Sequence, residues 1–281
     1  MTMRTMDPAL VDGYETGRRM LRRHDPTYYL ATRRLPRELR PATHALYGFV
    51  RTADEIVDGP HRAATPDARR AALDAWEAEL HAGAASRAPV VRALADAATR
   101  HRLPLGELAI YMRSMRIDCA PVRISSWEEL VSYMDGSAGS VGRIMASLLE
   151  VPAPDFGRLG HAFQLANFIR DVGEDHRLDR VYLPASDRAR FGVAEADLSA
   201  ARAGPELRAL LAHEVARARE LFASAAPAVA SAPRSIRPGV RIAIGLYLRM
   251  LDRVEAAGFD VLRRPRGVRI RDLPGAVVKA L

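Results

Sequence analysis

The stretch FQLANFIRDVGED, residues 163–175, decides the fold. Its polar side chains include Gln164, Asn167, Asp171 and Asp175, which recur at steps of three, four and four residues. Side chains spaced in this way lie on one face of an α-helix. Because most of the residues between them are Phe, Leu, Ala, Ile and Val, the polar face has apolar flanks. Such a face lines a cavity more readily than it faces water.

A second acidic segment lies earlier in the chain, at residues 47–58, and reads YGFVRTADEIVD. Arg51, Asp54 and Asp58 occupy positions i, i+3 and i+7 of a helical pattern, so they share a face. Taken alone, this pair of carboxylates is more typical of a solvated acidic surface than of a metal site. The first stretch makes a functional site the better interpretation, because two such helices facing each other would place four carboxylates around one pocket.

Four carboxylates in one pocket repel one another unless divalent cations lie between them. Oxygen ligands favour Mg²⁺, which keeps few protein ligands and bridges to phosphates. Arg51 and Arg170 lie in the same two segments and would add positive charge. We therefore expect a magnesium site that neutralises a departing diphosphate, with apolar walls that shelter a carbocation from water. These are the features of an allylic diphosphate site.

The rest of the chain predicts an all-α protein. Amphipathic patterns such as residues 68–83 and 205–225 are frequent, and runs of alternating polar and β-branched residues are almost absent. Breaks at Pro and Gly separate about eight expected helices by connections too short to be domain linkers. We expect a single domain, residues 1–281, built as a helical bundle around a central cavity.

Composition excludes several classes of protein. The 281 residues are 48% hydrophobic and 27% charged, the balance of a globular domain. The single cysteine, Cys119, excludes an internal disulfide framework and favours a cytoplasmic location. We find no secretory signal and no apolar run near 18 residues, so we expect at most peripheral membrane contact.

The net charge of +8 raises a rival hypothesis, a non-catalytic binder of nucleic acid or anionic membrane. Lys279 is the only lysine, so almost all of the 42 basic residues are arginines, and they are spread along the chain without a dense block. The two acidic segments argue further against this hypothesis. We expect no nucleic-acid partner.

The acidic segments resemble the two aspartate-rich signatures of the squalene and phytoene synthase family. The resemblance is carried by ALYGFVR (45–51) leading into DEIVD, by QLANFIRDVGED (164–175), and by RVYLP (180–184). It extends from about His24 to the arginine-rich end, where residues 246–247 and 258–264 look like the carboxy-terminal helix of the family. Long motifs in the same order make the resemblance specific.

The resemblance implies an isoprenoid-synthase fold, prenyl diphosphate substrates and two or three Mg²⁺ ions bound with the diphosphate. Carried over by position, the metal ligands would be Asp54, Asp58, Asn167, Asp171 and Asp175. The diphosphate pocket would be lined by His24, Arg51, Gln164, Asn167, Arg170, Tyr182, Tyr247 and Arg264.

Three positions depart from the family pattern. Family members usually carry a tyrosine just before the Gly-x-Ala segment of the central helix, and we assign Asp135 to that place. Pro26 stands where the family often has a lysine, and Arg123 lacks the aromatic residue that usually follows it. These departures weaken the case for holding a second diphosphate. Asp135 is then a catalytic candidate, as a base or as a group that orients an acceptor.

The leading functional hypothesis from the sequence is therefore a Mg²⁺-dependent prenyltransferase that transfers the prenyl group to a small aromatic acceptor, such as a carbazole. The alternative is the majority activity of the family, head-to-head condensation of two prenyl diphosphates to phytoene, squalene or dehydrosqualene. Neither the donor chain length nor the oligomeric state follows from the sequence.

Overall fold

The computed structural model describes residues 7–262, and these residues are almost entirely helical, which confirms the all-α prediction. Thirteen α-helices occur in this part of the chain rather than about eight, because short helices stand where the sequence pattern predicts connections. The helices are α1 (Pro8–His24), α2 (Pro26–Thr32), α3 (Arg40–Asp58), α4 (Pro66–Ala82), α5 (Pro89–His101), α6 (Gly106–Ile117), α7 (Trp127–Met134), α8 (Ser140–Leu149), α9 (Ala153–Arg177), α10 (Ala185–Phe191), α11 (Pro205–Ser224), α12 (Ala226–Ser231) and α13 (Arg237–Ala256).

Short elements complete the fold between these helices. The one-turn helices η2 (Gly83–Ala85) and η4 (Glu195–Ser199) follow α4 and α10, and the wide helical turn η3 (Asp135–Gly139) joins α7 to α8. The strands β1 (Val122–Arg123) and β2 (Arg180–Val181) pair in parallel. Their pairing fixes the segment after α6 beside the end of α9.

Helix starts follow local rules that the sequence already contains. Ser126 caps α7, since its hydroxyl accepts a hydrogen bond from the Glu129 amide at 3.3 Å. The Glu129 carboxylate in turn accepts from the Ser125 amide at 2.7 Å. Thr65 caps α4 in the same way. These contacts fix the start of α7 at Trp127.

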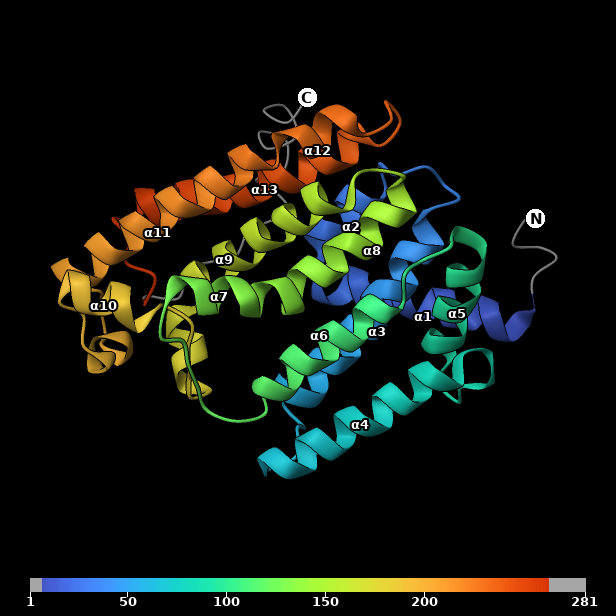
Figure 1. Cartoon of the computed structure of the whole chain (residues 1–281), viewed down its shortest axis with the longest axis horizontal. Helices are drawn as coiled ribbons and strands as arrows, with labels where there is room; N and C mark the ends of the chain where they lie inside the picture. Colours follow the sequence, from blue (N-terminus) through green and yellow to red (C-terminus); the bar gives the residue numbers. More distant parts are fainter. Residues whose placement is uncertain (1–6, 263–281) are drawn as a thin grey trace.

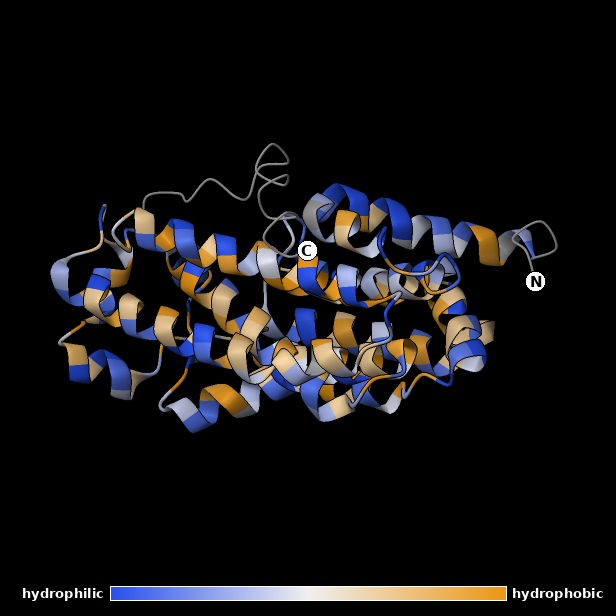
Figure 2. Ribbon diagram, turned by 90° about the horizontal axis from the view of Figure 1, so that it is seen from above, coloured by the Kyte–Doolittle hydropathy of each residue, from blue (hydrophilic) through white to orange (hydrophobic). Residues whose placement is uncertain are grey.

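The buried apolar residues form two main clusters, one on each side of the bundle. One contains residues of α9, α11 and α13, and the other contains residues of α1, α3, α5 and α6. Figure 1 shows the same division, with α11, α12 and α13 along one side of α9 and the amino-terminal helices on the other. Polar and apolar residues alternate along the helices in Figure 2, as packing of amphipathic helices requires.

Glycines allow α8 and α9 to approach closely. A Cβ atom at Gly142 would lie 2.3 Å from the Phe156 carbonyl oxygen, and one at Gly160 would lie 2.5 Å from the Ala138 carbonyl oxygen. A larger residue at Gly142 would push α9 away from α8, and one at Gly160 would push α9 away from η3. This contact holds α9 with its polar face toward α3. Among the described residues, no helix combines the length and the apolar character needed to cross a membrane.

Candidate active site

A cavity of about 590 Å³ lies between α3 and α9. Both aspartate pairs line it, Asp54 and Asp58 from α3 and Asp171 and Asp175 from α9. The structure thus brings together carboxylates that are more than a hundred residues apart in sequence. Of the other residues assigned to this site from the sequence, those that also line the cavity are His24, Arg51, Gln164, Asn167, Arg170, Tyr182 and Tyr247.

Two of the four carboxylates, Asp54 and Asp175, lie in an electrostatically unfavourable environment. Burial raises the pKa of Asp175 to about 8, and the negative charges of Asp171 and Asp58 add to this effect. Burial also raises the pKa of Asp54 to about 6, although the Tyr111 hydroxyl donates a hydrogen bond to it at 2.7 Å. The influence of Asp58 on Asp175 shows that the two helices lie within electrostatic reach of each other.

Such a set of oxygen donors fits Mg²⁺. The residues that would hold the ions are the four aspartates, together with the Asn167 amide oxygen. The fit rests on the donor chemistry and on the gathering of four carboxylates in one cavity.

Arginine side chains contact the acidic residues around the cavity. The Arg170 guanidinium donates to both oxygens of Asp171, at 2.7 Å from Nε. The buried Arg180 side chain donates to Asp58. At the other edge, Glu55 pairs with both Arg51 (3.3 Å) and His24 (3.4 Å). Positive charge therefore borders the carboxylates, as the binding of a diphosphate requires.

Three aromatic side chains form another part of the cavity wall, and sequence reasoning assigned only Tyr182 to it. Tyr133 and Phe168 also line the cavity. The hydroxyls of Tyr133 and Tyr182 both donate hydrogen bonds to the Asp118 carboxylate. A sequence signal existed for Asp118. Tyr111, Met115 and Asp118 recur at i, i+4 and i+7, the stripe that faces the cavity.

Asp135 does not line the central cavity, so its predicted place there is wrong. Its side chain is 47% exposed and pairs with Arg143 at 2.7 Å and with His161 at 3.2 Å. It lines a separate hollow beside α6. The reason is helical phase, because Asp135 lies two residues after Tyr133 and therefore about 200° around the helix. The phenol that faces the cavity from this helix is Tyr133. Arg264, the remaining predicted site residue, lies outside the described residues.

The polar cavity continues into an apolar one of about 270 Å³. Tyr47, Val50, Ser137 and Tyr247 line both. Farther in, the walls are mainly apolar side chains of α2, α8, α9, α13 and the segment that follows α2, including Leu35, Val141, Met145, Leu149, Phe156 and Leu159. The lining of this second cavity suits an apolar ligand.

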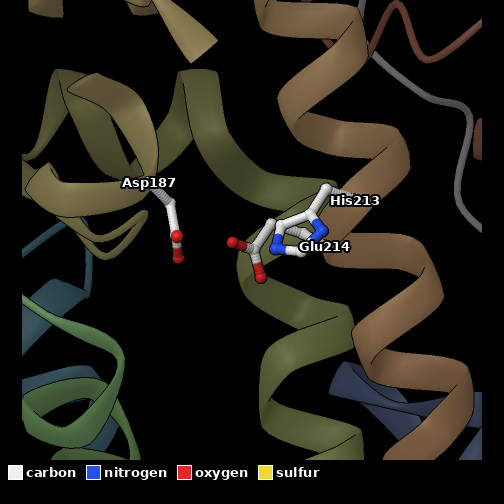
Figure 3. Close-up of side chains that lie close together, drawn as sticks. All are labelled: Asp187, His213 and Glu214. Atoms are coloured by element: carbon white, nitrogen blue, oxygen red, sulfur yellow. The ribbon is translucent and has the colours of Figure 1, made fainter. Parts of the chain in front are cut away.

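Asp187, His213 and Glu214 form a separate cluster between α10 and α11 (Figure 3). Their ligand atoms lie within coordinating reach of one another, but Arg217 already contacts both carboxylates at 2.9 Å. The guanidinium also lies over the Trp127 ring, 4.1 Å from its centroid. This is a buried ion-pair cluster, and none of its members lines the central cavity.

A family model described as squalene/phytoene synthase matches residues 21–273 of the chain. The chain belongs to the squalene/phytoene synthase family. It is 32% identical to the phytoene synthase of Arthrospira platensis over 96% of this chain and 94% of that protein. It is 36% identical to the phytoene synthase of Thermus thermophilus over 88% of this chain and 84% of that protein.

Solved structures of the family share the fold. A dehydrosqualene synthase in complex with a ligand superposes with a TM-score of 0.89 at 25% identity, over 96% of each chain. The squalene synthase HpnC from Alicyclobacillus acidocaldarius superposes with a TM-score of 0.81 at 28% identity, over 92% of this chain and 98% of that one. The protein is therefore a prenyltransferase with the all-α isoprenoid-synthase fold, in a family that depends on divalent metal ions.

Proposed function

We propose that the enzyme joins two prenyl diphosphates head to head to a product of the phytoene, squalene or dehydrosqualene type. One observation carries the proposal: two opposed pairs of aspartates, bordered by arginines, line a polar cavity that continues into an apolar one. The names of the related proteins agree with it. Transfer to an aromatic acceptor has less support, because Asp135, the base that this hypothesis invoked, lies outside the cavity.

The substrate diphosphates would bind at the polar end of the cavity. Arg51 and Arg170 supply charge, and His24 and Tyr247 supply further hydrogen-bonding groups at the cavity wall. The Gln164 and Asn167 amides face the same space. Two or three Mg²⁺ ions, held by Asp54, Asp58, Asn167, Asp171 and Asp175, would neutralise the charge that develops on the leaving diphosphate.

The walls of the two cavities govern the fate of the reactive cation. When the allylic C–O bond breaks, the diphosphate leaves with the electron pair and the prenyl group becomes a carbocation. The apolar walls exclude water, so the double bond of the second prenyl diphosphate is the nucleophile within reach. A new C–C bond forms and a proton is lost, which leaves a joined chain that still carries the second diphosphate. Loss of that diphosphate and of a second proton gives a hydrocarbon of the dehydrosqualene or phytoene type, whereas a product of the squalene type also requires a hydride donor.

The test is a product assay with prenyl diphosphates as the only organic substrates. Purified enzyme is supplied with Mg²⁺ and either farnesyl or geranylgeranyl diphosphate, and we expect a C30 or C40 hydrocarbon by mass spectrometry. A prenylated product that forms only when a carbazole is added, with no hydrocarbon in its absence, would refute head-to-head condensation.

The aspartate pairs are tested by substitution. Asp171→Asn removes one carboxylate from the cavity, and we expect turnover to fall by about 10²–10³-fold, the usual effect of removing a group that stabilises the leaving charge. Asp67→Asn is the matched control, because the Asp67 side chain is 93% exposed. We expect this variant to keep full turnover. Equal turnover of the two variants would show that the cavity carboxylates are not part of the reaction.

Two broader expectations remain proposals. We infer that the whole chain, residues 1–281, acts as one domain, with both apolar clusters contributing walls to the same cavity. We also propose a cytoplasmic location, which Cys119 supports because it is buried as a free thiol.

A further inference from the structure

Asp118 is a carboxylate of the cavity wall that belongs to neither aspartate-rich motif. It directly follows α6, and only 6% of its surface is exposed. A buried carboxylate is costly unless hydrogen bonds and charges compensate for it. The hydrogen-bond partners of Asp118 therefore indicate its role in the cavity wall.

Both oxygens of Asp118 accept hydrogen bonds from phenols. The Tyr133 hydroxyl donates to Oδ2, and the Tyr182 hydroxyl donates to Oδ1 at 2.8 Å. The two phenol oxygens lie 3.5 Å apart. A phenol has a single O–H, and in both tyrosines this O–H is donated to Asp118. Toward its other neighbours each phenol oxygen can therefore act only as a hydrogen-bond acceptor.

The rings of these phenols form one aromatic group with Phe168. Tyr182 stacks on Phe168 with their centroids 4.0 Å apart, and Tyr133 lies 5.2 Å from Tyr182. All three rings line the cavity. The faces of aromatic rings attract cations, and the attraction is larger where water is excluded.

Arg180 anchors the backbone of Asp118. The Arg180 guanidinium donates to the Asp118 carbonyl oxygen at 2.7 Å and also to the Asp58 carboxylate. The pairing of β1 with β2 sets Arg180 opposite Val122, four residues after Asp118. The position of Asp118 is therefore set by the backbone and does not depend on its own side chain.

We propose that Asp118 is a positioning residue that holds the Tyr133 and Tyr182 hydroxyls away from the substrate, so that ring faces and oxygen lone pairs meet the prenyl carbocation. The inference deepens the proposed function and rests on it. It also assigns the two phenols a role other than donating to the diphosphate. In an Asp118→Asn variant the new amide N–H₂ is a donor, so one phenol must turn its own O–H elsewhere.

The test measures turnover, KM and product partition for Asp118→Asn. We expect kcat to fall about tenfold to a hundredfold, the effect of losing a hydrogen bond to a charged group, with KM little changed. We also expect a larger share of prenyl alcohol, which forms when water adds to an unprotected cation and loses a proton. Asp96→Asn is the matched control, because Asp96 accepts from the Tyr14 hydroxyl at 2.6 Å outside the cavity.

A second measurement separates positioning from a structural role. In a Tyr133→Phe/Tyr182→Phe background the phenol hydroxyls are absent, so adding Asp118→Asn should change kcat and the alcohol share less than twofold. A full additional loss in that background, or a fall in kcat with an unchanged alcohol share, overturns the proposal. So does a tenfold increase in the Mg²⁺ concentration needed for half-maximal activity, which would make Asp118 a metal ligand. Thermal unfolding of each variant checks that it is folded.

Failure of the proposed function gives a different result. If wild-type enzyme makes no hydrocarbon from prenyl diphosphates, condensation is refuted, but release of diphosphate and alcohol still reports the cation. The Asp118 comparison then uses the rate of diphosphate release, and an unchanged rate in Asp118→Asn overturns the positioning role.

Discussion

Tyr133 and Asp135 stand two residues apart and face different sides of the same wall. Tyr133 is buried and lines the cavity, whereas Asp135 is half exposed and pairs with Arg143 and His161. A shift of one or two residues in assigning a helix position therefore exchanges a cavity phenol for a surface carboxylate. At this scale, helical phase decides function more than residue type does.

Asp135→Asn tests this placement. Since the carboxylate lies outside the cavity, we expect turnover and product to stay within about twofold of wild type. The unfolding free energy should fall by less than about 1 kcal/mol, as for other exposed ion pairs. Steady-state kinetics and urea unfolding measure the two effects. A loss of turnover comparable to that of Asp171→Asn would show that Asp135 takes part in the reaction.

At the scale of elements, α9 carries most of the site. Its polar face supplies Gln164, Asn167 and two aspartates, and the glycine contacts with α8 hold that face toward α3. The carboxy-terminal helix α11 packs along α9 (Figure 1), and α13 adds Tyr247 to the cavity wall. Helix packing thus orients side chains that the helix itself only spaces.

The burial of Glu214, where α11 packs against α10, predicts that the stability of the folded protein depends on pH. Burial raises the pKa of Glu214 to about 7 in the folded protein, above its ordinary value of 4.5. A carboxyl with a raised folded pKa is uncharged in both states at low pH, and it costs stability as the pH rises through 7. Glu214→Gln removes this cost, and Arg217 keeps its contact with Asp187.

We therefore expect Glu214→Gln to gain stability over wild type between pH 5 and pH 8, by at most about 3 kcal/mol. Urea unfolding at the two pH values measures the difference, and Glu38→Gln, at an exposed position, sets the baseline. If the difference between variant and wild type were the same at both pH values, the burial of Glu214 would not control this titration.

At the scale of the whole molecule, the concentrated negative charge of the cavity makes folding depend on what binds there. Ligands that bind only the folded state raise its stability, by about 2.7 kcal/mol at a hundred times their Kd. Mg²⁺ and inorganic pyrophosphate together should therefore raise Tm by roughly 5 °C. Differential scanning fluorimetry measures this shift.

The controls for this shift are specific to the site. Excess chelator should reverse the stabilisation, and Asp171→Asn should show much less of it, whereas Asp67→Asn should match wild type. An equal rise in Tm for Asp171→Asn would place the binding of Mg²⁺ and pyrophosphate elsewhere on the protein.

The sequence by itself determined the helical class, the two aspartate-rich faces and the family resemblance. These properties are local, because spacing of three and four residues sets which side chains share a helix face. Residues 54, 58, 171 and 175 could be singled out because two such faces occur together in one chain. Capping at Ser126 was predictable on the same local grounds.

Only the tertiary structure decided which faces meet. Arg180 reaches Asp58 because two-residue strands pair across the bundle, and Asp118 meets Tyr133 and Tyr182 from three different segments. Asp135 was misplaced because a pattern of residues does not specify the rotation of a helix against its neighbours. Packing sets that rotation through contacts between distant segments, such as Gly160 against the Ala138 carbonyl, and no local spacing encodes them.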